Sequence, residues 1–358
     1  MKSKAILGLA LAGGLSAMAC AQQPGTVAPG SPPAAAPRAG FGLPPTEPIE
    51  QITGNVYKIF GGGGNTLVVV QKEGVVLVDT KMPGNGQAII DEVKKITDKP
   101  IVAIISTHSH PDHIGSTDFL REKYPNVALI MSEGTKAEIQ ANPQHQPTWL
   151  PTRTYTDHLV IGEGEDRIEL FHTGVGHTNG DTFVLVPSAR LLFMGDVMAW
   201  NMAPFLPAGG AEAIAEETEK LVELTDGKVD VVVEGHGHVN DWNGLVRLAK
   251  FNRALVSEAR KAYDAGLPPG AAVAELRKNP DFAPLLDNRI KKGLEYGNTP
   301  LARAHMNVNV VYAEFAGEEV GFGIANGGPL PATDKHKGSD PKDTAPPTPE
   351  MLAAAVDK

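Results

Sequence analysis

The apolar and polar positions of this chain alternate between two patterns, one typical of buried strands and one typical of helices. Continuous apolar runs fill Gly74–Asp79 and Ile101–Thr107, as expected for strands buried on both faces. Between them, residues 89–96 repeat apolar side chains at helical spacing. A strand, an amphipathic helix and a second strand predict an α/β unit.

The same patterns recur less regularly along the chain. Further strands are predicted at Val56–Phe60, Thr66–Val70, Val127–Met131, Arg167–His172, Thr182–Val186, Arg190–Met194 and Val229–Val233, with a helix at Ala211–Leu224. After Asn243 the pattern becomes helical, with one long amphipathic helix from Leu245 to Ala262 and shorter helices at 270–278 and 300–316. We therefore expect a core domain at residues 49–243 and a helical extension at 244–326.

The N-terminus has the features of a targeting sequence. Two lysines precede an uncharged stretch from Ala5 to Ala19 that ends in small residues, which predicts a secretory signal peptide at residues 1–21. Cleavage at an A-x-A site would leave Gln22 as the first mature residue. The alternative is a weak lipobox that places a lipid on Cys20. Either reading predicts an exported protein, periplasmic or secreted.

Two further segments have compositions that disfavour a packed core. Residues 22–48 are rich in Pro, Ala and Gly and are predicted to form a flexible linker. Residues 327–358 are rich in Pro, Lys, Asp and Gly and are predicted to form a disordered tail.

Composition and charge exclude several classes of function. The net charge of -10 over 358 residues disfavours nucleic acid as a partner, because phosphates require clustered Lys and Arg. No apolar run reaches the roughly 18 residues of a transmembrane span. The only cysteine, Cys20, rules out cysteine zinc clusters and an intrachain disulfide framework.

A cluster of histidines directly follows the buried strand Ile101–Thr107. His108, His110, Asp112 and His113 lie within six residues. Packing explains such a cluster poorly, since neighbouring buried imidazoles need partners and repel one another when protonated. Imidazole and carboxylate are good zinc ligands, so this segment predicts a metal site.

Three later segments fit the same site. His177 lies in a Gly-His-Thr segment, Asp196 in Gly-Asp and His236 in Gly-His-Gly, each shortly after a predicted strand. Side chains beyond the carboxyl ends of strands in a layered α/β core can meet in one crevice. His238 competes with His236 for the ligand role.

The order H-x-H-x-D-H, G-H-T, G-D and G-H-G resembles the metallo-β-lactamase superfamily over roughly residues 50–240. The resemblance implies an α/β fold, an αββα sandwich with a metal site along one edge of its two sheets. It implies two zinc ions, with iron or manganese as alternatives for the same nitrogen and oxygen ligands.

The resemblance also assigns the ligands. The implied first-metal ligands are His108, His110 and His177; the second-metal ligands are Asp112, His113 and His236; Asp196 bridges both ions. Asp79 resembles a carboxylate that supports the ligands, with an ordinary strand-end cap as the alternative. In this reading a hydroxide shared by the two ions attacks a carbonyl or phosphoryl centre. Asp112 would also orient that hydroxide or move a proton, as a catalytic residue.

The residues around Asp196 bear on the substrate. Many true β-lactamases place a lysine shortly after this position, whereas Val197–Trp200 contain none. A bridging aspartate is instead shared with glyoxalase II-like enzymes and lactonases. We therefore expect a small-molecule ester, lactone or thioester, with the apolar segment Trp200–Gly210 lining the pocket or packing into the core. A β-lactamase and a non-catalytic zinc-binding envelope protein are the alternatives.

Overall fold

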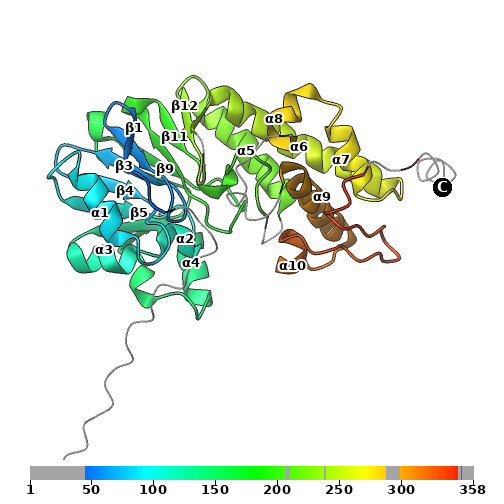
Figure 1. Cartoon of the computed structure of the whole chain (residues 1–358), viewed down its shortest axis with the longest axis horizontal. Helices are drawn as coiled ribbons and strands as arrows, with labels where there is room; N and C mark the ends of the chain where they lie inside the picture. Colours follow the sequence, from blue (N-terminus) through cyan, green and yellow to red (C-terminus); the bar gives the residue numbers. More distant parts are fainter. Residues whose placement is uncertain (1–44, 207–209, 238, 288–298, 346–347, 349–358) are drawn as a thin grey trace, which may run out of the picture. The chain divides into compact units, whose positions relative to one another are not determined.

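The computed structural model describes residues 45–206, 210–237, 239–287, 299–345 and 348 (Figure 1). Residues 39–358 fall into one compact unit, which contains both the predicted core domain and the predicted helical extension. The predicted signal peptide, Cys20 and most of the predicted linker lie outside the described residues. In the part of the chain that is described, no helix combines the length and hydropathy needed to cross a membrane.

The first sheet contains seven strands within the described residues, in the order β1-β2-β3-β4-β5-β6-β7. These are β1 Glu50–Thr53, β2 Val56–Ile59, β3 Thr66–Val70, β4 Val75–Val78, β5 Ile101–Ile105, β6 Ala128–Ser132 and β7 Arg153–Tyr155. Strands β1 to β4 pair antiparallel, and β4 to β7 pair parallel. The parallel pairs require crossovers, which contain α1 Gly86–Lys94, α2 Pro111–Ile114, α3 Thr117–Lys123 and α4 Glu133–Ala141.

The second sheet has the order β13-β12-β11-β10-β9-β8 in the described chain. Its strands are β8 His158–Ile161, β9 Ile168–Phe171, β10 Phe183–Val186, β11 Leu191–Phe193, β12 Val231–Val233 and β13 Val239–Asp241. Only the β11–β12 pair is parallel, and its crossover contains α5 Ala211–Thr225. The sheet is therefore mixed, like the first.

Side chains alternate between two buried layers along the central strands. In β4, Val76 and Val78 pack between the sheets, whereas Val75 and Leu77 pack against α1 and α3. This period of two, with both faces buried, explains the continuous apolar runs in the sequence. Figure 1 shows α1 and α3 on one side of the strands and α5 and α6 on the other, which is the predicted αββα layering.

The chain after the second sheet is helical, as predicted. The helices are α6 Trp242–Asp264, α7 Gly270–Leu276, α8 Ala283–Leu286, α9 Pro300–Ala316 and α10 Phe322–Ala325. The Asp241 side chain caps α6 by accepting the Gly244 N–H at 2.9 Å. Helix α9 begins with Pro300 after the capping Thr299 and ends at Gly317, whose φ of 68° suits glycine. Helix α6 packs against α5, α7 and α9.

Part of the segment predicted to be disordered instead packs against α9. Leu330 is 2% exposed, and its backbone exchanges two hydrogen bonds with Ser339, at 2.7 and 2.8 Å. The buried ring of His336 lies 2.9 Å from a carboxylate oxygen of Glu318. These contacts bury individual residues of a segment whose overall composition is polar. The prediction of a disordered tail is therefore corrected for residues 327–345.

Candidate metal centre

The segment after β5 places the first predicted ligands at the carboxyl end of the first sheet. His108 is fully buried, and His110 has an extended backbone directly before α2. Pro111 occupies the first position of this single-turn helix, where its missing N–H costs nothing. Asp112 and His113 lie on the turn itself. The end of β5 and the single turn of α2 therefore position four ligand side chains, His108, His110, Asp112 and His113, at the carboxyl end of the first sheet.

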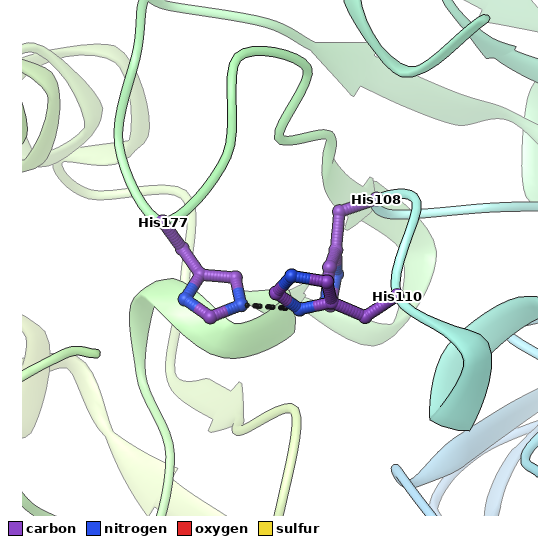
Figure 2. A group of neighbouring side chains, drawn as sticks. All are labelled: His108, His110 and His177. Carbon is purple, nitrogen blue, oxygen red and sulfur yellow. Dashed lines mark hydrogen bonds between the residues drawn. The ribbon is translucent and has the colours of Figure 1, made fainter. Parts of the chain in front are cut away.

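His108, His110 and His177 form a first ligand group (Figure 2). The Nδ1 atom of His110 lies 3.1 Å from Nε2 of His108 and 2.9 Å from Nε2 of His177. Burial lowers the pKa of His177 to about 3 and that of His108 well below its usual value. Three neutral imidazoles whose nitrogens converge in this way present lone pairs suited to a metal ion.

Asp112, His113 and His236 form a second ligand group. His236 Nε2 lies 3.2 Å from Oδ2 of Asp112 and 3.2 Å from Nε2 of His113. Burial opposes charge on His236, but the carboxylates of Asp196 and Asp112 outweigh it and raise its pKa to about 9. This group therefore differs from the first, because its imidazoles lie among carboxylates.

Asp196 faces both groups. It lies on a 3₁₀ turn directly after β11. Its Oδ1 atom is 3.2 Å from Nε2 of His113, and its Oδ2 atom is 3.4 Å from Nε2 of His236 and 3.7 Å from Nε2 of His177. A carboxylate with its two oxygens between the groups has the placement that a bridging ligand requires.

Two glycines leave room for the ligands. A Cβ on Gly64 would lie 2.2 Å from the His113 ring, and one on Gly235 would lie 2.2 Å from Oδ1 of Asp196. Any side chain at these positions would displace a ligand. The residues present thus fit a pair of metal ions, because they supply six nitrogen or oxygen ligands in two groups and a carboxylate that faces both groups.

Asp79 supports the centre from behind. Its Oδ1 accepts the Thr107 N–H at 2.8 Å, and its Oδ2 accepts from the Thr107 hydroxyl at 2.7 Å. The same Oδ2 lies 2.7 Å from Nδ1 of His113, so Asp79 fixes both the ring and the start of the ligand loop. Its backbone φ of 64° is unusual for aspartate. Between the two roles that the sequence left open, these bonds favour support of the ligands over a simple cap.

Lys81 is a nearby residue that the sequence analysis missed. Its side chain is fully buried, and its Nζ donates to the carbonyls of Ile59 at 2.7 Å and Gly64 at 2.9 Å. Burial lowers its pKa to about 7. It thereby fixes the backbone that packs on His113. No pattern in the sequence distinguishes this lysine from a solvated one.

The segment after Asp196 lies mostly in the core. Trp200, Met202 and Leu206 are each at most 4% exposed, which supports the core-packing alternative for these three. Phe205 is half-buried and its ring centroid lies 5.9 Å from that of His177, so for this residue the expectation that it lines a pocket stays a prediction. The Phe205 carbonyl lies 2.7 Å from Nδ1 of His177 and orients that ring. Helix α9 contacts this segment, because the Asn307 amide donates to the Pro204 carbonyl at 2.9 Å. The helical extension thus packs beside the first ligand group.

The remaining histidines have other surroundings. His158 stacks on Phe171, His172 lies 2.9 Å from the Asp181 carbonyl, and His145 lies beside Trp149. His305 and His336 pack between α9 and the segment that follows it. His238 lies outside the described residues, so its competition with His236 stays a prediction.

Behind the His177 loop, two buried carboxyl groups face each other across Gly176. A Cβ on Gly176 would lie 2.0 Å from Oε2 of Glu217 and 2.9 Å from Oδ2 of Asp181. Burial raises the pKa of Asp181 to about 7 and, with the nearby Asp181, raises that of Glu217 well above its usual value. The folded state therefore retains protons that the unfolded state loses from about pH 4 upward.

The variant Glu217→Gln is expected to stabilise the protein at neutral and alkaline pH. Because both folded pKa values are raised, wild-type stability falls as pH rises through about 7, whereas a neutral amide escapes this cost. We expect little change in Tm near pH 4.5 and a higher Tm for the variant near pH 8, because the pKa of Glu217 is raised by burial. Thermal unfolding across this range measures it, with the exposed Glu216→Gln on the same helix as control. A pH-independent difference would contradict it.

Comparison with known proteins identifies similar sequences. The family model described as the metallo-beta-lactamase superfamily matches residues 59–236. A probable metallo-hydrolase of Streptococcus pyogenes is 41% identical over 183 residues, 50% of this chain and 75% of that relative. The 2,4-dinitroanisole O-demethylase subunit alpha of a Nocardioides strain is 29% identical over 176 residues, 47% of this chain and 52% of the relative. Hydroxyacylglutathione hydrolase of Aliivibrio fischeri is 31% identical over 157 residues, 42% of this chain and 53% of the relative.

The chain thus spans only about half the length of the last two relatives. Among solved structures, DIM-1 metallo-beta-lactamase has a TM-score of 0.51 at 20% identity and covers 59% of this chain and 98% of its own. A double mutant of the sec-alkyl sulfatase PisA1 has a TM-score of 0.59 at 15% identity and covers 75% of this chain and 50% of its own. At these identities the structural matches support the fold alone.

Proposed function

We propose that this chain, which belongs to the metallo-β-lactamase superfamily and is a metal-dependent hydrolase, hydrolyses a small ester, lactone or thioester with two zinc ions. The proposed ligands are His108, His110 and His177 for the first ion and Asp112, His113 and His236 for the second, with Asp196 between them. Two such ions, when bound, lower the pKa of a water molecule and polarise a substrate oxygen.

The observation that carries this proposal is the carboxylate of Asp196 between two complete ligand groups. No lysine follows it in Val197–Trp200 to hold the carboxylate of a β-lactam. The segment continues to Leu206 without a lysine or an arginine. The match to a hydroxyacylglutathione hydrolase, by its name a hydrolase of an acyl thioester, supports a carbonyl substrate.

The side chains of the chain itself would divide the remaining work. The carboxylates of Asp112 and Asp196 are 19% and 13% exposed, whereas the rings of His113 and His236 are at most 2% exposed. Solvent and substrate therefore reach the centre on the carboxylate side. In the proposed mechanism Asp112 accepts a proton on this side and delivers it to the leaving group, as a general acid and base.

Arg253 on the long helix α6 does not provide a free cationic anchor for a glutathione moiety. Arg253 on α6 is engaged by Glu219 at 2.7 and 2.9 Å and by Glu212 at 2.5 Å. These ion pairs join α5 and α6, so the guanidinium of Arg253 is already engaged. A compact acyl substrate therefore fits the proposal better than a large polyanionic one, which the net charge of -10 would also repel.

The proposed location is outside the cytoplasm, in the periplasm or secreted, on the grounds of the N-terminal sequence. A signal peptide ending at residue 21 and a lipid on Cys20 remain the two proposed forms of processing. Mass spectrometry of the mature N-terminus separates them, and an intact Met1 in the native host would contradict both.

Substrate preference is expected to favour carbonyl esters, lactones or thioesters over β-lactams and phosphodiesters. The measurement is kcat/KM for one substrate of each of these five classes on the zinc-loaded protein. The kcat/KM of the preferred carbonyl substrate is expected to exceed that of the β-lactam, a cephalosporin, and that of the phosphodiester by at least tenfold. A tenfold difference corresponds to about 1.4 kcal/mol of transition-state preference. A margin of that size in the opposite direction would show that the proposed substrate class is wrong.

A further inference from the structure

Helix α4 contacts both loops that carry the first ligand group. Oε2 of Glu138 accepts from the Ser109 hydroxyl at 2.6 Å, and Oε1 accepts from the Asn179 backbone N–H at 2.8 Å. The side-chain amide of Asn179 donates to the same Oε1 at 3.1 Å. Ser109 stands between the two histidines of the H-x-H motif, and Asn179 follows His177 by two residues.

These two loops belong to different sheets. The H-x-H loop follows β5 of the first sheet, and the His177 loop connects β9 to β10 of the second. The Glu138 carboxylate therefore connects loops from the two sheets, and the first ligand group draws its histidines from the same two loops. The hydrogen bonds of Glu138 go to Ser109 and Asn179, so they act on the loops that carry the three imidazoles.

The start of α4 is fitted closely to the same loop. The hydroxyls of Ser132 and Thr135 both donate to the Gly180 carbonyl, at 2.6 and 2.8 Å. A Cβ on Gly134 would lie 2.2 Å from the Asn179 carbonyl oxygen. These contacts fix the register of α4 on the His177 loop, and Glu138, one turn further along the helix, then reaches across to the first sheet.

We propose that Glu138 is a positioning residue for the first metal ion, because it holds the two ligand loops at the separation that the ion requires. The inference rests on the proposed metal centre. Without Glu138, the His110 and His177 segments would each lose an anchor, and ion binding would have to order them. Loss of such a supporting partner typically weakens metal affinity about 10–100-fold.

A general structural role predicts a different result. If Glu138 only stabilised the fold, its removal would weaken both ligand groups alike. The two groups can be measured separately in variants that disable one of them, with His236→Ala leaving the first group intact and His110→Ala leaving the second. The probe is zinc itself, added to metal-free protein in competition with a chromogenic chelator, so that the readout does not depend on activity.

In the His236→Ala background, Glu138→Ala is expected to weaken zinc binding about 10–100-fold, while in the His110→Ala background the change stays within about twofold. Glu138→Gln, which keeps one acceptor oxygen, should recover much of the affinity. The matched control is Glu133→Ala on the same helix, since Glu133 is exposed and bonds to Lys136 and Thr154 rather than to either ligand loop. It should leave both affinities unchanged.

Three outcomes overturn the inference. Equal zinc affinity with and without Glu138 in the His236→Ala background would refute it and leave the proposed function standing. Equal weakening in both backgrounds would reduce Glu138 to a structural residue. Absence of zinc binding by the wild-type protein would overturn the proposed function and this inference together.

Discussion

Replacement of Asp196 by alanine is expected to lower kcat/KM by at least about 10³-fold, roughly 4 kcal/mol of transition-state stabilisation. Its carboxylate lies within 3.7 Å of imidazole nitrogens from both ligand groups. It is therefore the one side chain whose loss removes a ligand from each proposed ion. Two dications held a few ångströms apart repel each other, and the bridging negative charge offsets that repulsion.

The fold should survive this change, because the Asp196 side chain packs on ligands rather than within an apolar cluster. The measurements are steady-state kinetics, zinc content after gel filtration, and Tm of the metal-free protein. Asp118→Ala is the control, since Asp118 is an exposed carboxylate in the first turn of α3 and belongs to neither ligand group. Full activity and two retained ions in Asp196→Ala would refute the assignment of the bridge.

Removal of metal is expected to abolish hydrolysis, leaving less than about 1% of the activity, and two equivalents of zinc per chain should restore it. In the proposed mechanism the nucleophile and the electrophile both depend on bound ions. Dialysis against a chelator, followed by titration with zinc and an assay at each step, measures the effect.

Iron and manganese serve as comparison metals, because the same nitrogen and oxygen donors accept them. Elemental analysis of gently purified protein identifies the native ion. Undiminished activity at trace metal content would show that the centre is not catalytic, whereas bound metal with no hydrolysis of any substrate class would favour the alternative of a non-enzymatic envelope protein.

The layers of the fold could be predicted from the sequence where burial is strong. β4 and β5 are apolar on both faces, so the runs Gly74–Asp79 and Ile101–Thr107 identified them almost to the residue. The edge strands β1 and β13 escaped prediction, because their residues are largely exposed and polar. Helix α4 escaped for a related reason, since only Thr135 and Ile139 of its nine residues are buried.

The candidate site could be predicted because its residues are of the types that commonly bind metal ions. Histidines and aspartates at strand ends are rare enough to be read as ligands, and the structure brings all seven into adjoining groups. The supporting residues were not predictable, because a glutamate such as Glu138 or a lysine such as Lys81 has many ordinary roles. Their function follows from partners distant in sequence, such as Asn179, which only the folded chain reveals.

Each proposed ion draws ligands from both sheets, and this has a consequence for how the protein forms and persists. The first group joins His108 and His110 to His177, and the second joins Asp112 and His113 to His236. Contacts this distant in sequence form late in folding, because long loops must close first. A chain with separated sheets therefore offers only part of each ligand group, and a metal ion would bind tightly only after the sheets have docked. The proposed ions would then act as removable cross-links, so that metal supply would set the lifetime of the folded protein against unfolding and proteolysis.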